Sequence, residues 1–140
     1  MSDTPKHSVS VAGVVVDDDN RVLVIRRDDN GAWEAPGGVL ELDEPFQEGV
    51  AREVFEETGL HVSVGHLTGV YKNISRGVVA LVFRCVPVSG ETHRTAEARE
   101  VGWMTTTQVQ AAMTPAFAVR VLDAFGGQVH IRTHDGTNLL

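Results

Sequence analysis

Residues 38–60, GVLELDEPFQEGVAREVFEETGL, form the most strongly patterned segment of the chain. Pro45 is tolerated in the first turn of a helix, and Gly59 suits the position just after the last turn. The apolar residues between them recur at helical spacing. We therefore predict a helix over residues 45–58.

The predicted helix carries charge on the face that should be buried. At about 100° per residue, Phe46, Val50 and Val54 follow one another at intervals of about 40° and define an apolar stripe. Glu57 falls between Phe46 and Val50, and Glu53 lies just beyond Phe46. Both carboxylates therefore occupy or border the stripe that we expect to face the core.

Carboxylates beside an apolar stripe need compensation. A charge-rich helix usually presents its charges to water, but these groups would repel each other and lose hydration, which costs several kcal/mol. A divalent cation would offset that cost. Glu53, Glu56 and Glu57 stand at i, i+3 and i+4, close enough to share one or two ions. Ligation by oxygen alone favours Mg²⁺, with Mn²⁺ as a substitute, over zinc.

The rest of the chain alternates between strand and helix patterns. Residues 8–16 and 21–27 are rich in β-branched side chains and flank a DDDN turn, which predicts a hairpin, and residues 28–38 read as a loop. The order of elements predicts an α/β fold, a mixed α+β or α/β/α sandwich, built as a single domain over residues 1–140. The tail, residues 129–140, is ambiguous. Further predicted elements are strands 61–71, 77–88 and 100–104, the first two paired, and helices 105–113 and 115–125.

Composition limits the classes of function. The 140 residues are 42% hydrophobic, which fits one globular domain, and the net charge of −7 argues against broad nucleic-acid binding. No apolar run reaches the roughly 20 residues that span a bilayer, and residues 1–10, MSDTPKHSVS, lack the order of a signal peptide. We therefore expect a cytoplasmic protein with no membrane partner. Cys85, among alternating apolar residues, reads as a buried strand residue.

The spacing of the glycine, glutamate and arginine residues within residues 38–60 is the most specific signal in the chain. It resembles, at every prescribed position, the Nudix box of the Nudix hydrolase family, and Trp33 and Pro36 precede it as they often do in that family. The resemblance implies a Nudix α/β/α sandwich around a mixed β-sheet. The matching pattern is Gly38, five residues, Glu44, seven residues, Arg52-Glu53-Val54, one residue, Glu56-Glu57, one residue and Gly59-Leu60.

The resemblance also implies a reaction and a set of residues that perform it. Water attacks phosphorus and breaks a pyrophosphate linkage, with Mg²⁺ as the cofactor. Arg52 resembles the arginine that orients a neighbouring glutamate by an ion pair; the alternative is an exposed surface arginine. Glu44 serves either the helix N-terminus or the network of Arg52. The implied metal ligands are Glu53, Glu56, Glu57 and a backbone carbonyl of Gly37 or Gly38, and the implied catalytic residues are Glu53, Arg52, Glu57 and Glu97.

A base must take the proton of the attacking water. Family members use either a glutamate of the box or one on a later loop. Glu53 is the candidate in the box. Glu97, in EAREVGW, resembles the later glutamate, and Glu100 competes with it. The alternative interpretation of Glu97 and Glu100 is that they are ordinary charged residues of a loop.

Candidate substrate-binding residues lie near the second predicted strand. Arg26 and Arg27 leave that strand close to where the substrate should lie, but neighbouring strand residues point to opposite faces, so at most one of them should contact phosphate. Trp33, Tyr71 and Phe83 are candidates for stacking on a base, although strand aromatics more often belong to the core. These residues define the expected substrate side of the site.

The expected substrate is a nucleotide or another nucleoside diphosphate derivative. Residues 75–77 stand where ADP-ribose and dinucleoside polyphosphate hydrolases carry a proline or a tyrosine, and neither is present. By default this favours a MutT-like nucleoside triphosphate pyrophosphohydrolase. The alternatives are an ADP-ribose or other NDP-X pyrophosphatase, a non-catalytic nucleotide sensor and an isopentenyl diphosphate isomerase. Dimers are common in the family, and the apolar end at Leu139 and Leu140 is a candidate contributor to a homodimer.

Overall fold

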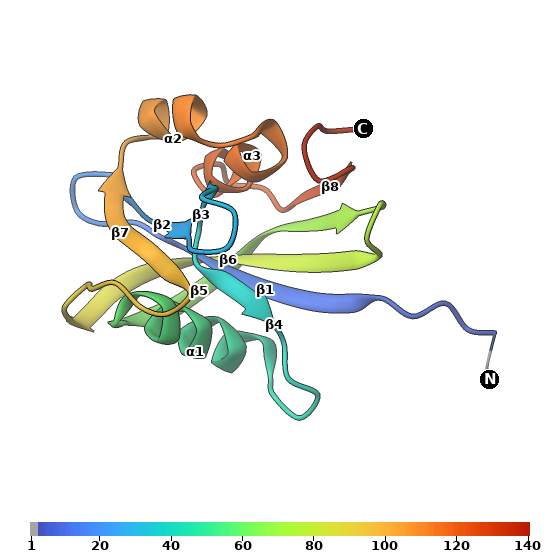
Figure 1. Ribbon diagram of the computed structural model, residues 1–140, viewed down its shortest axis with the longest axis horizontal. Coiled ribbons are helices and arrows are strands. Elements are labelled where there is room, and N and C mark those ends of the chain that lie inside the picture. The colour runs from blue at the N-terminus through green and yellow to red at the C-terminus, as the bar shows by residue number, and fades with distance from the viewer. Residues whose placement is uncertain (1–2) are drawn as a thin grey trace.

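The computed structural model describes residues 3–140; residues 1–2, part of the stretch searched for a signal peptide, lie outside the described residues. Figure 1 shows three layers, with helix α1 (Phe46–Thr58) on one face of the strands and helices α2 (Thr106–Ala112) and α3 (Pro115–Asp123) on the other. The prediction of an α/β/α sandwich around a mixed β-sheet is confirmed.

Two sheets make up the middle layer. A five-stranded mixed sheet has the order β4-β1-β6-β5-β8, and a three-stranded antiparallel sheet has the order β3-β2-β7. In the larger sheet β1 runs parallel to β6 and β5 runs parallel to β8. The strands are β1 (Ser8–Val15), β2 (Val22–Arg27), β3 (Trp33–Glu34), β4 (Gly37–Val39), β5 (Leu60–Asn73), β6 (Val78–Gly90), β7 (Ala98–Met104) and β8 (His130–His134).

The predicted hairpin of the first two strands is wrong. A tight turn does connect them, because the Asp17 amide donates to the Arg21 carbonyl at 3.0 Å, and Val16 and Val22 form a single antiparallel bridge. Beyond that bridge the strands separate into different sheets. A strand has only two edges to pair, and those of β1 are taken by β4 and β6 while those of β2 are taken by β3 and β7.

Other strand predictions need smaller corrections. The segment predicted as a loop over residues 28–38 contains β3 and the start of β4, which are too short to show a period-two pattern. The predicted pairing of β5 with β6 is confirmed, with both strands longer than expected. The ambiguous tail supplies β8, which becomes an ordered edge strand because it pairs along β5 from Gly69 to Asn73.

Helix α1 ends where the sequence predicts. Gly59 adopts a φ of 83°, which glycine tolerates best, and its amide donates to the Phe55 carbonyl. Pro45 occupies the position before the first turn, and no side chain caps that turn. None of the helices in the described part of the chain is long and apolar enough to cross a membrane.

The prediction that an apolar stripe of α1 is buried is confirmed for Val50 and Val54, which are fully buried. It is wrong for Phe46, which is 44% exposed. A helical wheel orders residues around the axis but not along it. Phe46 lies in the first turn and belongs to neither core cluster of residues 3–140. The buried sector extends instead along the second half of the helix, where Glu53 and Glu57 are.

One hydrophobic cluster lies on each side of the large sheet. Val50 and Val54 of α1 pack with Val11, Leu23 and Cys85 on one side. The cluster on the other side lies against α2 and α3. A Cβ atom at Gly13 would lie 3.1 Å from methyl groups of both Val50 and Val54, so the absence of a side chain there lets α1 pack closely on β1. This close packing gives the carboxylates of α1 a rigid base.

Candidate active site

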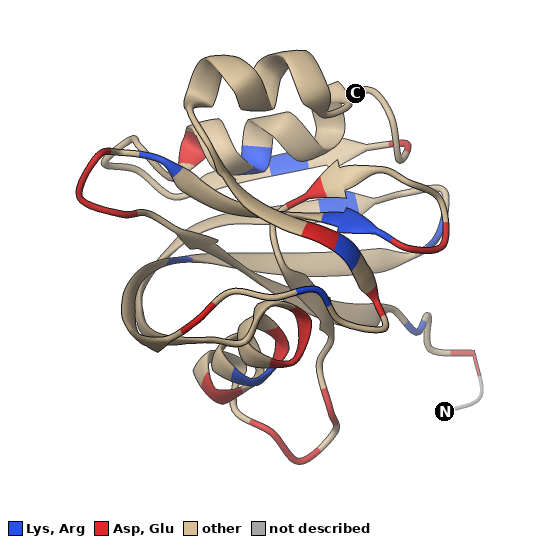
Figure 2. Ribbon diagram, turned by 60° about the vertical axis from the view of Figure 1, so that its left-hand side comes forward, with Lys and Arg blue, Asp and Glu red and all other residues tan. Residues whose placement is uncertain are grey.

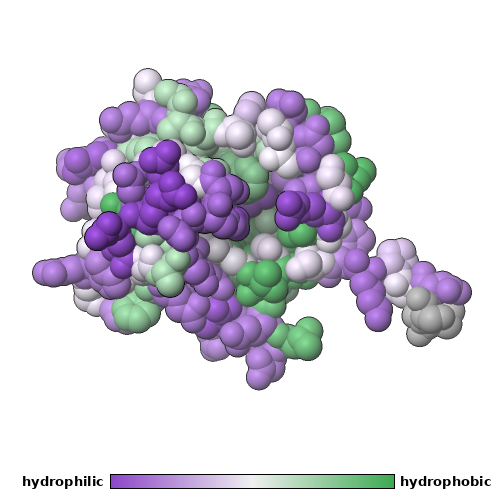
Figure 3. Space-filling view, viewed as in Figure 1, coloured by the Kyte–Doolittle hydropathy of each residue, from purple (hydrophilic) through white to green (hydrophobic). Residues whose placement is uncertain are grey.

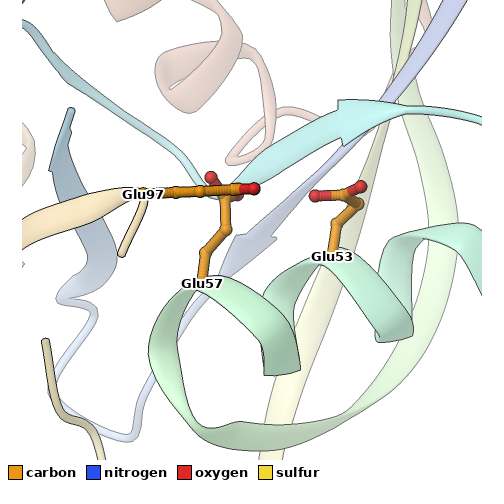
Figure 4. A group of neighbouring side chains, drawn as sticks. All are labelled: Glu53, Glu57 and Glu97. Carbon is orange, nitrogen blue, oxygen red and sulfur yellow. The ribbon is translucent and has the colours of Figure 1, made fainter. Parts of the chain in front are cut away.

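Three carboxylates converge beside helix α1. Glu53 and Glu57 rise from consecutive turns of the helix, and Glu97 reaches them from the segment just before β7 (Figure 4). One carboxylate oxygen from each of the three lies within 4.8 Å of the others. Glu53 and Glu57 are 8% and 5% exposed, whereas Glu97 is exposed. Figure 2 shows other acidic residues on α1 and on the loop that precedes it, so the region is strongly negative.

Glu57 is the most deeply embedded of the three. Its Oε1 atom accepts a hydrogen bond of 2.6 Å from the Gly37 amide. Burial raises the pKa of Glu57 to about 8, against the lowering effect of that hydrogen bond, and the charges of Glu53, Glu34 and Glu97 raise it further. Without a cation, the cluster is therefore short of positive charge.

Arg52 holds Glu53 in place. Its Nη1 atom donates to Glu53 Oε1 at 2.8 Å, while its Nε and Nη2 atoms donate to the two oxygens of Glu44 at 2.7 and 2.8 Å. These hydrogen bonds from Arg52 lower the pKa of Glu44 to about 2. Glu44 thus belongs to the network of Arg52 and does not cap the helix. Burial raises the pKa of Glu53, and Arg52 opposes this effect.

Glu56 lies apart from the other two glutamates of its helix. Its side chain is exposed, and Oε2 accepts a hydrogen bond of 3.2 Å from Arg52 Nη1. At about 100° per residue, Glu56 projects about 100° away from Glu57, whereas Glu53 and Glu57 differ by only about 40°. The structure therefore groups Glu97, from a distant part of the chain, with Glu53 and Glu57 instead of Glu56.

The two glutamates that compete as the later base, Glu97 and Glu100, have different surroundings. Glu97 belongs to the carboxylate cluster, whereas Glu100 lies 3.7 Å from the Arg26 guanidinium. Among residues 3–140, no side chain makes an ion pair with Glu97. Of the two candidates, Glu97 is thus the one whose carboxylate faces the other site residues.

Gly37 and Gly38 form the opposite wall of the cluster. Both lie on β4, where they pair with Ala12 and Val11 of β1. A Cβ atom at Gly38 would lie 2.5 Å from Glu53 Oε2, so only glycine leaves room for that carboxylate. The glycine backbone lies close to the carboxylates, with the Gly37 amide 2.6 Å from Glu57 Oε1. Its carbonyl as a metal ligand stays a prediction.

A cavity of about 1480 Å³ opens beside the cluster and extends to α3. Arg27 and Trp33 line it. Arg26 is not among the described lining residues; its Nε atom donates to the Gly31 carbonyl at 3.0 Å, and its guanidinium lies 5.8 Å from the Trp33 ring. The two arginines therefore differ as expected for neighbouring strand residues. Figure 3 shows hydrophobic residues interrupting a mainly hydrophilic surface near the middle of the face it presents.

The other aromatic candidates belong to the interior. Tyr71 is fully buried and donates a 2.7 Å hydrogen bond to Asp123, and Phe83 is 5% exposed in the core beneath α1. Neither ring is available for stacking on a base. Trp33, which is partly buried at the cavity wall, is the candidate that keeps access to a ligand.

The family model for the NUDIX domain matches residues 6–125, most of the chain and all of the site described above. The chain belongs to the Nudix hydrolase family. Its enzyme class is that of the Nudix pyrophosphohydrolases. Nudix hydrolases generally use divalent metal ions, and the carboxylate donors of Glu53, Glu57 and Glu97 fit such an ion.

Individual relatives agree with this assignment. The Nudix chain is 58% identical over 137 residues to a MutT-like protein of Streptomyces ambofaciens, covering 97% of this chain and 89% of the relative. It is 37% identical over 100 residues to an ADP-ribose pyrophosphatase of Methanocaldococcus jannaschii, covering 66% of this chain and 59% of the relative. A NUDIX hydrolase structure from Nitrosomonas europaea superposes with a TM-score of 0.79 at 22% identity, covering 94% of this chain and 81% of that one, and shows the same fold.

Three residues that line the cavity of this Nudix protein were not predicted from the sequence. Glu34 lies on β3, and Phe117 and Arg120 lie on α3. The available signal was Arg120 in the middle of the helix PAFAVRVLD, whose other residues are apolar except for the terminal Asp123. It was not decisive, because a surface helix commonly carries one charge and the sequence does not show what the charge faces.

Proposed function

We propose that this protein hydrolyses the pyrophosphate linkage of a nucleoside triphosphate in a Mg²⁺-dependent reaction, with residues 1–140 acting as one Nudix domain. The observation that carries the proposal is the convergence of Glu53, Glu57 and Glu97 within 4.8 Å on the wall of the cavity. Buried carboxylates of like charge destabilise the site unless a cation joins them. A phosphorylated substrate supplies further oxygen ligands to such a cation.

The residues have distinct roles in this proposal. Glu53 and Glu57 hold the ion, with the carbonyl of Gly37 or Gly38 as a further ligand, and Glu56 at the margin of the site. When bound, the divalent cation neutralises phosphate charge and lowers the pKa of a bound water.

Glu97 is the proposed general base. Arg52 donates to Glu53 and the Gly37 amide donates to Glu57, so both of those carboxylates already accept hydrogen bonds. Glu97 has no such partner among the described residues and is exposed to solvent. Its carboxylate is thus the member of the cluster that is free to accept the proton of the attacking water.

The extent of the cavity supports a substrate as large as a nucleotide. Its volume of about 1480 Å³ exceeds the roughly 300–1,000 Å³ of most small-molecule sites. Arg27 lines the cavity and is the proposed phosphate contact, although its guanidinium also binds Asp29 through hydrogen bonds of 2.6 and 2.9 Å. The alternative substrate class is an NDP-X compound, favoured by the likeness to the ADP-ribose pyrophosphatase.

Incubation with Mg²⁺ and a panel of substrates tests the proposal. A nucleoside triphosphate should yield the monophosphate and pyrophosphate, whereas ADP-ribose would yield AMP and ribose 5-phosphate; product analysis separates the two classes. Glu57→Gln should reduce kcat by about 10² or more. Glu48→Gln, an exposed position on the same helix, is the matched control. Nucleotide binding with no turnover of any substrate would instead identify a sensor.

A further inference from the structure

Arg120 lines the cavity and makes no ion-pair contact with any residue that the structure describes. Its Nε atom is buried and has no hydrogen-bond partner, and no carboxylate of residues 3–140 lies within ion-pair distance. The guanidinium carbon lies 4.6 Å from the Phe117 ring and 5.2 Å from the Tyr71 ring. Aromatic faces stabilise a cation only in part, so donors of Arg120 remain available to a ligand in the cavity.

The contact of Arg120 with His134 does not satisfy those donors. Arg120 Nη2 lies 3.2 Å from His134 Nε2, and the Gly136 amide lies 2.9 Å from Nδ1 of the same ring. A neutral imidazole accepts at one nitrogen and donates at the other. If Nδ1 accepts from the Gly136 amide, Nε2 carries the proton. Two donors, Nε2–H and the guanidinium N–H, then face each other and form no hydrogen bond. Arg120 therefore gains no hydrogen bond in the tautomer that the shorter contact favours.

Glu34 supplies an acceptor in the same cavity. It lies on β3, its side chain is 15% exposed, and its carboxylate is 3.4 Å from Arg27 Nη1. Burial raises the pKa of Glu34, with Arg27 and then Arg120 lowering it, so the charges of Glu34 and Arg120 act on each other. The cavity thus offers a donor fork and an acceptor from different elements.

The walls that β3, β6, α2 and α3 contribute to the cavity are mainly apolar, and Asn73, Arg76 and Thr114 are polar residues of the same lining. These walls suit a flat heteroaromatic ring better than a phosphate, because a phosphate would lose its hydration there without a metal ion. In the proposed function, the phosphates bind in the part of the cavity that carries the carboxylates. The apolar lining residues from these elements are Val78, Ala80 and Val82 of β6, Ala112 at the end of α2, Phe117 of α3 and Trp33 of β3.

We propose that Arg120 and Glu34 bind the lactam edge of a nucleobase, with Arg120 donating to the ring carbonyl and Glu34 accepting from the adjacent ring N–H. Guanine and uracil have such an edge, whereas adenine has no carbonyl and the carbonyl of cytosine has no neighbouring N–H. This inference rests on the proposed function for the placement of the phosphates. It names the class of base that the enzyme selects.

The first test is a comparison of kcat/KM for GTP, UTP, ATP and CTP. GTP and UTP should exceed ATP and CTP by about 10-fold or more, because a site built to hydrogen-bond a substrate group rejects analogues that lack it. Arg120→Met should remove most of this preference, and Arg120→Lys, which keeps the charge but not the fork, should retain part of it. Equal kcat/KM for all four nucleotides would overturn the proposal.

Stability separates a binding role from a structural one. Replacing an uncompensated buried cation by an apolar side chain of similar length is neutral or stabilising, so Arg120→Met should keep or raise the Tm while losing base selectivity. A lowered Tm with an unchanged ranking of nucleotides would show a structural role only. Arg84→Met is the matched control, since Arg84 lies 5.1 Å from the Phe125 ring, donates to the Ala124 carbonyl and is not among the described lining residues.

Binding without catalysis distinguishes failure of this inference from failure of the proposed function. In the metal-free protein, guanosine and uridine should shift the amide signals of Arg120 and Glu34 in ¹H–¹⁵N spectra, whereas adenosine and cytidine should not. That result with no hydrolysis of any nucleotide would sink the proposed function alone. Hydrolysis without base preference, and without selective shifts, would sink the lactam site alone.

Discussion

Arg52 on α1 binds both oxygens of Glu44, at 2.7 and 2.8 Å, and also donates to Glu53. One guanidinium therefore joins the loop before the helix to a carboxylate of the candidate metal site. Because the fork of an arginine is planar and rigid, the orientation of Glu53 depends on Glu44, which belongs to no part of the carboxylate cluster.

Loss of this arrangement should affect catalysis more than substrate binding. Arg52→Lys keeps the charge but not the fork, so we expect kcat to fall by about 10-fold or more with a small change in KM. Glu44→Gln should weaken the same network. In urea unfolding, the double-mutant cycle of Arg52→Met and Glu44→Gln should show that the two substitutions are not additive. Additive effects on both stability and kcat would contradict the linkage.

Metal binding should release a proton. The pKa of Glu57, raised to about 8 by burial, means that the metal-free carboxyl is largely protonated at neutral pH. A cation binds the ionised form, so Mg²⁺ affinity should rise with pH up to about 8 and then level off. Calorimetry in buffers of different ionisation enthalpy measures the proton directly. If the Mg²⁺ affinity does not change between about pH 6 and about pH 8, Glu57 is excluded as the titrating ligand.

Glu97 should act on the chemical step. Glu97→Gln removes the proposed base and should lower kcat by about 10²–10⁴ while Mg²⁺ binding by Glu53 and Glu57 persists. Glu100→Gln, whose carboxylate faces Arg26 at 3.7 Å, should retain nearly full activity. The reverse result would assign the base to Glu100.

The glycine wall should be intolerant of a single methyl group. In Gly38→Ala the new Cβ would lie 2.5 Å from Glu53 Oε2, so the carboxylate must move and activity should fall by about 10². Circular dichroism should show the fold retained. Gly102→Ala in β7, where nothing lies within 4 Å of the added Cβ, is the control and should leave kcat unchanged.

The network around Asp123 should control acid stability. Tyr71 donates to Asp123 at 2.7 Å, and Arg132 donates two hydrogen bonds of 2.8 Å. Burial alone would raise the pKa of Asp123, but Arg132 and Tyr71 outweigh it and lower that pKa below its ordinary 3.8. The stabilisation is therefore complete above about 3.8 and is lost as pH falls through the lowered value.

Asp123→Asn tests this network. At neutral pH the substitution should reduce the free energy of unfolding by about 2–3 kcal/mol, because it removes charge-assisted hydrogen bonds. The difference from the wild type should shrink in urea titrations at acid pH, where the wild-type carboxyl also becomes neutral. A difference that stays constant from neutral pH to acid would show that the charge of Asp123 contributes nothing.

Local sequence signals were sufficient for helix α1 and half of the candidate site. Gly59 ends the helix because it adopts a positive φ, and the angular spacing of Val50, Glu53, Val54 and Glu57 places two carboxylates beside the core. These properties depend on neighbours three or four residues apart, which the sequence displays directly. The same spacing suggested Glu56 as an equal partner, which the structure turns toward Arg52.

The remaining relationships depend on contacts between distant segments. The sequence predicted the five longer strands, β1, β2, β5, β6 and β7. A strand's partners depend on which edges other strands occupy, so the separation of β1 from β2 was decided by the two sheets. The position of Glu97 beside Glu57 and the lack of a hydrogen-bond partner for Arg120 Nε among the described residues have the same origin. By itself the sequence determined the family pattern, the helix and its buried carboxylates. Only the tertiary structure decided which side chains share the cavity, because burial and pairing are properties of the packed chain.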